Sequence, residues 1–289
     1  MVGQKKKNIR WNTMGILAGG FLGVILLGGV LLWMPFSNRQ PIEFMDALFT
    51  SVSAVCVTGL VTITPAFQFT LAGQMILLVL IQIGGLGVIA CVTAFFLLLR
   101  RKITLKERIV IQETYNMDKL SGMVLLVRGV LFGTFAVEGV GAALYAIQFI
   151  PEYGVAKGIW YSIFHAVSAF CNAGFDILGT TENKYPSLTG YVGEPTINIV
   201  IMILIIVGGI GFLTWDDICT NRWHFKKYRM QSKVILVTSV ILIIVPAIFF
   251  FLFDFTGLPP GEKILASLFQ SVTPRTAGFN TADLTAMTE

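Results

Sequence analysis

The sequence predicts an all-α polytopic membrane protein, built from repeated units around a pseudo-fourfold pore. Hydrophobic residues make up 55% of the 289-residue chain and charged residues only 13%, whereas soluble domains carry about 25% charged residues. The mean hydropathy is +0.78. Long apolar segments alternate with shorter ones, and a similar sequence follows each short segment. These observations favour a multispanning membrane protein over a soluble domain.

Apolar segments of two lengths define the expected elements. Long segments can cross about 30 Å of hydrocarbon, and we expect them at 12–34, 70–99, 122–150, 196–219 and 232–253. Shorter runs of about a dozen residues reach less than about 20 Å at 1.5 Å per residue. We expect these to form re-entrant half-helices at 43–54, 158–169 and 262–272.

The repeating unit is therefore a span, a half-helix, a loop and a closing span. The predicted division is a cytoplasmic N-terminus at 1–11, unit one at 12–108, unit two at 109–221 and an incomplete unit three at 222–289. Unit three contains the span, the half-helix and the loop. The pattern thus occurs twice in full and once in part.

The three loops resemble one another. Each has an aromatic residue, a Val-Ser or Val-Thr step, and a glycine followed by Leu or Phe: FTSVSAVCVTGL from position 49, FHAVSAFCNAGF from 164 and FQSVTPRTAGF from 269. Lipid cannot satisfy the free peptide groups of a loop at membrane depth, so such a loop must be buried or line a watery path. Repeated loops of this kind predict an ion pathway.

The residue types in these loops favour cations. Backbone carbonyls can coordinate a dehydrated cation without a net charge that would trap it, and glycine reaches the required backbone conformations at least cost. Gly59, Gly174 and Gly278 occupy the same place in the three loops. The partially negative C-terminal ends of the half-helices would point towards the pore.

Glycines also cluster in the closing spans. We interpret them mainly as sites of close packing against the half-helices and leave open a flexible point in the pore wall; they are Gly84, Gly85, Gly87, Gly208, Gly209 and Gly211.

Positive charge predicts the orientation. The net charge is +5, and fifteen of the 21 Lys and Arg residues lie before the first span, between spans two and three, or between spans four and five. The positive-inside rule places these regions in the cytoplasm. We therefore expect a multi-pass protein of the plasma (inner) membrane with a cytoplasmic N-terminus. The basic residues are explained by topology and contact with the lipid bilayer, without nucleic acid.

Several polar residues have expected roles. Glu138 lies in the middle of span three, where we favour a hydrogen bond between helices and leave a functional role open. We expect His165 to be a hydrogen-bonded packing residue. Arg275 should turn away from the pore and pair with Asp283 or Glu262.

Other expectations concern charge pairs and cysteines. Asp216 and Asp217 should pair with a nearby basic residue, from Arg222, Lys226 and Lys227. The chain has 4 cysteines and no CxxC pair, so we expect neither a disulfide framework nor a bound metal other than potassium. Cys56 and Cys171 should pack behind the loops.

The loops and the closing-span glycines together resemble the Trk/Ktr/HKT superfamily of potassium transporters, and most closely the membrane subunit of bacterial Ktr systems. The resemblance rests on residues 46–60, the run LIQIGGLG at 80–87 and residues 269–279. It implies four units around one pore, each donating one filter strand. The implied ion-binding filter residues are Cys56, Val57, Thr58, Gly59, Cys171, Asn172, Ala173, Gly174, Arg275, Thr276, Ala277 and Gly278.

The resemblance also implies substrate and partners. Glycine in all three loops matches the potassium-preferring pattern, whereas some plant relatives with serine in the first loop favour sodium. The implied assembly is a homodimer on a cytosolic nucleotide-binding ring, which would face the basic segments 100–108 and 222–233. Nucleotide would bind the ring, so this chain needs no cofactor, with potassium as its substrate. Sodium coupling is left open.

The sequence departs from the family pattern after Glu289, where the closing span of unit three and all of unit four would follow. The family's intramembrane gate and pore arginine belong to those parts and have no counterpart here. We expect this sequence to be part of a longer protein; the alternative is that a second copy or a second polypeptide completes the ring.

Other functions are weighed against potassium uptake. An intramembrane enzyme would need a nucleophile and base, paired carboxylates or His-rich metal spacing at one depth, and none is visible in the sequence. We therefore expect no enzymatic activity. A truncated, non-conducting structural or regulatory subunit and a sodium-permeable relative both stay open.

Overall fold

The computed structural model describes residues 13–87, 90–91, 93, 123–179, 187–222, 224–255 and 257–282. Within these residues the regular elements are α-helices and short 3₁₀ helices, which confirms the all-α prediction. The basic segments at 4–10 and 100–119, together with Asp283, lie outside the described residues.

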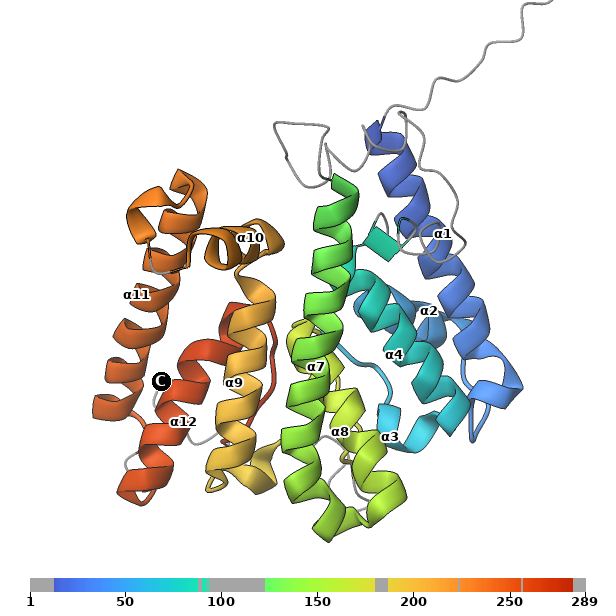
Figure 1. Cartoon of the computed structure of the whole chain (residues 1–289). Helices are drawn as coiled ribbons and strands as arrows, with labels where there is room; N and C mark the ends of the chain where they lie inside the picture. Colours follow the sequence, from blue (N-terminus) through green and yellow to red (C-terminus); the bar gives the residue numbers. More distant parts are fainter. Residues whose placement is uncertain are drawn as a thin grey trace, which may run out of the picture.

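The described helices follow the expected alternation of long and short elements only in part, because the half-helix expected at 158–169 extends over Val155–Phe170 and has 16 residues, as many as the helix Leu71–Leu86 (Figure 1). The region of unit one holds α1 (Thr13–Trp33), the 3₁₀ helix η1 (Pro35–Ser37), α2 (Phe44–Val55), α3 (Pro65–Gln68) and α4 (Leu71–Leu86). The region of unit two holds α7 (Met123–Tyr153), α8 (Val155–Phe170), η2 (Thr189–Tyr191), α9 (Pro195–Gly209) and α10 (Phe212–Asn221). The region of unit three holds η3 (Phe225–Lys227), α11 (Met230–Phe253), α12 (Pro260–Val272) and η4 (Thr273–Arg275).

Local sequence explains where several helices begin. Proline occupies the first turn of α3, α9 and α12, where its missing N–H costs no hydrogen bond. Thr70 caps α4 because its hydroxyl accepts a hydrogen bond from the Gly73 backbone N–H at 3.3 Å. Proline and the threonine cap therefore fix where these four helices begin.

The short helices α2, α8 and α12 are packed in the same way. Each contacts the long helix before it: α2 packs on α1, α8 on α7 and α12 on α11 (Figure 1). In addition, α4 contacts α8, and α9 contacts α12. The closing helix of one unit therefore packs against the short helix of the next, which sets the order of the three loops.

Two closing spans differ from the straight spans that hydropathy predicts. The predicted span 196–219 consists of α9 and α10, which meet at an angle of 96°. The break lies at Gly211, whose φ is +83°. Gly87 also has a φ of +83° and follows the end of α4 at Leu86. Hydropathy predicts one continuous apolar segment in both places, but a glycine with a positive φ follows the end of α4 and precedes the start of α10.

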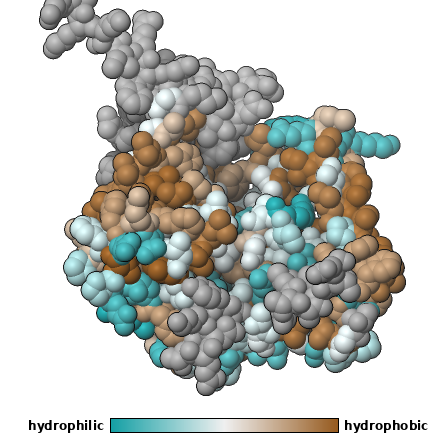
Figure 2. All heavy atoms as spheres, turned by 180° about the vertical axis from the view of Figure 1, so that it is seen from behind, coloured by the Kyte–Doolittle hydropathy of each residue, from teal (hydrophilic) through white to brown (hydrophobic). Residues whose placement is uncertain are grey.

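Membrane-length apolar helices are present. Val127–Tyr153 and Met230–Phe253 are long and apolar enough to cross a bilayer, and α9 with α10 makes a third candidate if the bent pair counts as one span. Apolar side chains are exposed along α1, α7 and α11. Figure 2 shows hydrophobic residues over both flanks of one face. Such broad apolar exposure is expected where lipid is the solvent.

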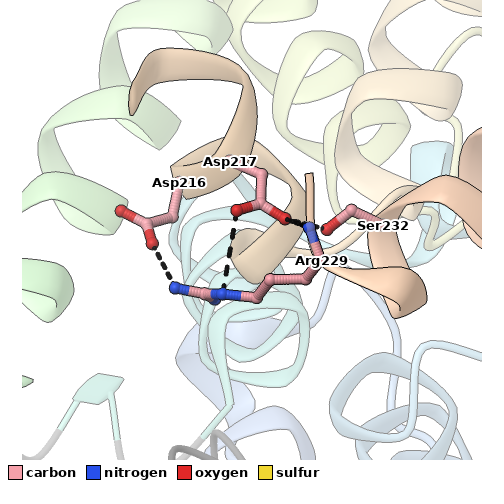
Figure 3. Close-up of polar contacts among 4 residues, drawn as sticks. All are labelled: Asp216, Asp217, Arg229 and Ser232. Atoms are coloured by element: carbon pink, nitrogen blue, oxygen red, sulfur yellow. Dashed lines mark hydrogen bonds and ion pairs between the residues drawn. The ribbon is translucent and has the colours of Figure 1, made fainter. Parts of the chain in front are cut away.

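An ion cluster joins α10 to the start of α11 (Figure 3). The Arg229 guanidinium lies 2.9 Å from Asp216 and 3.7 Å from Asp217. Asp217 also accepts hydrogen bonds from the Arg229 backbone N–H and the Ser232 hydroxyl. The expected partners were Arg222, Lys226 and Lys227, so that prediction is wrong. The chain reverses through η3, which brings the more distant Arg229 back to the aspartates.

Candidate functional site: three filter loops

Each of the three loops leaves the C-terminal end of a short helix. Gly59, Gly174 and Gly278 have φ angles of +75°, +70° and +76°. This left-handed region disfavours residues with a Cβ atom. All three loops therefore have glycine at the position where the backbone adopts a positive φ.

The first two loops share a second backbone feature that the third lacks. Val57 and Asn172 have φ angles of +57° and +58°, whereas Thr276 has a φ of −155°. The third loop has one residue fewer between its Val-Thr step and its glycine. The extra residue of the first two loops is accommodated by a left-handed turn. This left-handed pair was not predicted, although the length difference in the sequence signals it.

The Ser or Thr of the repeated step ties each loop to its helix. The Ser168 hydroxyl donates to the carbonyl oxygen of Phe175, and the Thr273 hydroxyl donates to that of Phe279, both at 2.7 Å. In the first loop, the Thr58 hydroxyl donates to the Ser53 hydroxyl at 2.9 Å. The repeated hydroxyl thus has a structural role: it closes the loop over the end of the helix.

The loops lie directly against one another. A Cβ atom added at Gly59 would lie 2.7 Å from the carbonyl oxygen of Ala173, and one added at Gly174 would lie 2.1 Å from that of Ala277. These distances leave no room for a side chain. A Cβ atom at Gly278 would meet no described residue within 4 Å. The first loop therefore abuts the second and the second abuts the third, while no described residue abuts the third loop at Gly278.

A hydrogen bond also joins the second loop to the third. The Thr276 hydroxyl donates to the side-chain oxygen of Asn172 at 2.7 Å, and the Asn172 amide donates to the carbonyl oxygen of Phe170 at 3.1 Å. Asn172 is buried. Its side chain therefore braces the third loop from behind the second.

The two loop cysteines have different environments. Cys171 is buried, as expected of a packing residue, but Cys56 is exposed. The expectation that Cys56 packs behind its loop is therefore wrong. Cys171 is covered by the closing helix of unit one, because a Cβ atom at Gly85 would lie 2.4 Å from its Sγ atom. Within the described residues, no equivalent helix covers Cys56.

Arg275 turns back towards its own unit. Its guanidinium donates a hydrogen bond to the Ser239 hydroxyl on α11 at 2.9 Å. The expected pairing with Glu262 is wrong, since the Glu262 carboxylate lies beside Gly193 instead. Arg275 is thus held by a neutral hydroxyl on the helix behind the loop.

The closing-span glycines separate into two kinds. A Cβ atom at Gly84 would lie 2.5 Å from the carbonyl oxygen of Val55, and one at Gly208 would lie 1.8 Å from that of Phe170. These glycines admit the carbonyl ends of the short helices, which supports the close-packing interpretation. Gly209 lies near Asn172. A Cβ atom at Gly87 or Gly211 would meet no described residue within 4 Å, and these two glycines mark the helix breaks instead.

Glu138 and His165 were expected to form packing contacts. Glu138 accepts a hydrogen bond from the Gln82 side chain on α4 at 3.0 Å. His165 is fully buried, and its Nδ1 atom lies 2.7 Å from the carbonyl oxygen of Tyr161. Glu138 therefore links α7 to α4 through a hydrogen bond, as expected. The hydrogen bond of His165 stays within α8, and its ring packs edge-on against Phe149 of α7, as expected of a packing residue.

One acidic residue beside the loops was not singled out from the sequence. Asp176 follows Gly174 by two positions, in the extended segment that leaves the second loop. Burial raises the pKa of its carboxyl from 3.8 to about 6, and a hydrogen bond from the Leu178 backbone N–H opposes that rise. Its position two residues after the loop glycine is the sequence feature that could have identified it.

A comparison with protein families decides the identity of this arrangement. The family model described as "TrkH: Cation transport protein" matches residues 16–289. This chain belongs to the TrkH family of cation transport proteins. It is therefore a membrane protein, as the apolar helices indicate.

Curated relatives support the assignment. The chain is 39% identical over 298 residues to the Ktr system potassium uptake protein B of Bacillus subtilis, covering 99% of this chain and 65% of the relative. It is 40% identical over 291 residues to the potassium/sodium uptake protein NtpJ of Enterococcus hirae, covering 98% and 63%. The chain thus spans somewhat less than two thirds of either relative.

A solved structure shows the same fold. The potassium transporter TrkH from Vibrio parahaemolyticus superposes with a TM-score of 0.64 at 18% sequence identity, covering 97% of this chain and 54% of the other. The TrkH-family fold therefore accounts for nearly all of the chain.

Proposed function

We propose that this chain carries the ion-translocating region of a potassium uptake protein of the plasma membrane, with a cytoplasmic N-terminus. The main support is the contact between neighbouring loops. Gly59 abuts the carbonyl group of Ala173 in the second loop, and Gly174 abuts that of Ala277 in the third. Three loops with one glycine conformation, arranged side by side, supply successive carbonyl groups to a common path. Carbonyl groups suit a dehydrated potassium ion.

The predicted filter residues are the ion-binding groups under this proposal. A fourth strand, from a further segment or another polypeptide, would occupy the open side beside Gly278. The longer curated relatives are compatible with a further segment. The loops contain no carboxylate, so selection would depend on carbonyl geometry and not on a charged ring.

Uptake by cells tests the proposal. A bacterium that lacks its own potassium uptake should grow at low external potassium when it expresses the full gene product containing this chain. Gly59→Ser and Gly174→Ser should each weaken the preference for potassium over sodium, because both glycines are left-handed and closely packed. Unchanged ion competition in both variants would refute the filter assignment. Normal membrane insertion without uptake would favour a non-conducting subunit.

A sodium-permeable protein is a second candidate. One relative is named a potassium/sodium uptake protein and is 40% identical to this chain. Measuring sodium uptake in the absence of potassium separates the two candidates. Sodium flux comparable to potassium flux would favour the second.

We also propose that the chain works as a homodimer with a cytosolic nucleotide-binding ring and needs no cofactor of its own. A relative named as part of a Ktr system supports a cytosolic regulatory partner. The Arg229 cluster would stiffen the segment between α10 and α11 on the basic, cytoplasmic side (Figure 3). Copurification of the ring with the wild-type protein, and its loss when Lys226 and Lys227 are changed to Glu, would test this contact.

A further inference from the structure

We propose that Glu138 is a positioning residue, which holds the second filter loop in register with the closing helix of unit one. This inference rests on the proposed function and assigns that function a residue outside the loops. Glu138 is 5% exposed in the middle of α7. Its Oε1 atom accepts a hydrogen bond from the Gln82 side chain on α4 at 3.0 Å, and the Cys171 thiol lies 4.0 Å from the same atom.

The carboxyl group therefore joins three parts of the molecule. Glu138 belongs to unit two, Gln82 belongs to unit one, and Cys171 is the first residue of the second loop. A polar side chain at membrane depth is costly unless it finds a partner. Gln82 supplies that partner across the boundary between the units.

The same helix also touches the loop directly. Gly85 follows Gln82 by three positions on α4, and a Cβ atom at Gly85 would lie 2.4 Å from Cys171 Sγ and 3.1 Å from Cys171 Cα. Residues three apart lie on one helix face. The hydrogen bond to Glu138 and the contact at Gly85 thus fix one face of α4 beside the start of the second loop.

The surroundings of Glu138 favour this role over direct ion contact. Glu138 and Gln82 line a cavity of about 350 Å³ between α4, α7 and α8, whose other lining residues are apolar or glycine. Val79 and Phe135 in this lining are 56% and 59% exposed on the outer surface of the helices. The cavity therefore opens sideways, towards the lipid side, so Glu138 acts on ions through the loop.

Two measurements test the role in the full-length protein. The first is thiol modification by a membrane-permeant maleimide, quantified at Cys171 by mass spectrometry with the exposed Cys56 as an internal reference. Glu138→Ala should speed the modification of the buried Cys171 by about threefold or more, the factor that corresponds to one interhelical hydrogen bond in a membrane protein. This measurement does not depend on transport.

The second measurement is potassium uptake with sodium as competitor. Glu138→Ala should raise the half-saturating potassium concentration by about threefold to twentyfold and weaken the preference for potassium. Glu138→Gln keeps an acceptor oxygen and should stay close to wild type. The exchange of both partners, Gln82→Glu with Glu138→Gln, should recover most of what Glu138→Ala loses.

Thr134 offers a matched control on the same helix. It lies one turn before Glu138, is fully buried, and its hydroxyl oxygen has no hydrogen-bond partner among the residues that the structure describes. Thr134→Val should therefore leave both readouts unchanged.

The outcomes separate this inference from the proposed function. Unchanged Cys171 modification in Glu138→Ala overturns the positioning role, whatever the uptake shows. The positioning role is also overturned if Cys171 is modified faster but sodium competes as in the wild type, or if only the maximal uptake falls. In either case the loop would move without changing the preference for potassium over sodium. If the wild-type protein inserts but transports no potassium, the proposed function fails, while the modification rates still decide whether Glu138 positions the loop.

Discussion

The second and third of the proposed filter loops reverse the chain by different means. The second is enclosed: Ala173 is fully buried, the first loop lies on one side of it and the third on the other. The third turns through the short 3₁₀ helix that contains Pro274, and a Cβ atom at Gly278 would meet no residue of the described part of the chain within 4 Å. Neighbours hold the second loop, whereas the third depends more on its own shorter turn. A substitution should therefore have a larger effect in the second loop than at the matching place in the third.

The largest difference is expected at the glycines. Gly174→Ser combines a left-handed φ with a Cβ atom 2.1 Å from the carbonyl oxygen of Ala277, so it should displace two loops and remove measurable potassium selectivity. Gly278→Ser carries only the backbone cost of about 1–2 kcal/mol, or about a fivefold to thirtyfold loss of affinity. Uptake with sodium as competitor measures both. An equally severe Gly278→Ser variant would contradict the difference and point to another segment beside Gly278.

A second comparison concerns two hydrogen bonds, one between neighbouring loops and one within a single loop. Thr276→Val removes the hydrogen bond to Asn172, whereas Thr58→Val removes a bond to Ser53 inside the first loop. One hydrogen bond is worth about 1 kcal/mol, so Thr276→Val should change the potassium-to-sodium preference by about fivefold. Thr58→Val should change it less, because the brace between neighbouring loops stays. A greater effect from Thr58→Val would show that bracing between loops does not control selection.

These comparisons also show what sequence reasoning could reach. The short helices and the left-handed glycines were predictable, because an apolar run of limited length and a residue without Cβ each have one main structural use. The breaks at Gly87 and Gly211 were missed, since hydropathy averages over residues that are apolar on both sides of a backbone break. Hydropathy identifies a membrane segment but does not report its dihedral angles.

The missed side-chain partners have a different cause. Arg229 pairs with Asp216 and Asp217 only because η3 folds the chain back, and Arg275 reaches Ser239 on a helix 36 residues earlier. Proximity in sequence favoured the wrong partners in both cases. The hydrogen bond from Thr276 to Asn172 likewise needs the three-dimensional order of the loops, which follows from the packing of α9 against α12.

The repeated hydroxyl provides a smaller test, of stability. Ser168→Ala leaves the buried carbonyl oxygen of Phe175 without its side-chain donor, and an unsatisfied buried acceptor costs about 1–3 kcal/mol. Ser53→Ala removes only a bond to the exposed Thr58 hydroxyl and should cost less. Thermal unfolding of the purified protein in one detergent compares them. A lower Tm for Ser53→Ala than for Ser168→Ala would show that the first loop, and not the second, depends more on its hydroxyl.

The smallest expected effect is a pH dependence at Asp176. Because burial raises the pKa of its carboxyl to about 6, the group is charged at external pH 7.5 and mostly neutral at pH 5. Its charge beside the second loop should attract potassium, with an energy of about 1 kcal/mol at contact distance in water. The half-saturating potassium concentration should therefore rise up to about fivefold as the pH falls through 6.

Asp176→Asn separates this charge from other effects of pH. The variant should bind potassium equally weakly at pH 5 and pH 7.5. The raised pKa means that the folded state binds the proton more tightly than the unfolded state, so the charged carboxylate lowers stability above pH 6. Asp176→Asn should consequently have a higher Tm than wild type at pH 7.5 and a similar Tm at pH 4. A variant that keeps the wild-type pH dependence of uptake would assign that dependence to another group.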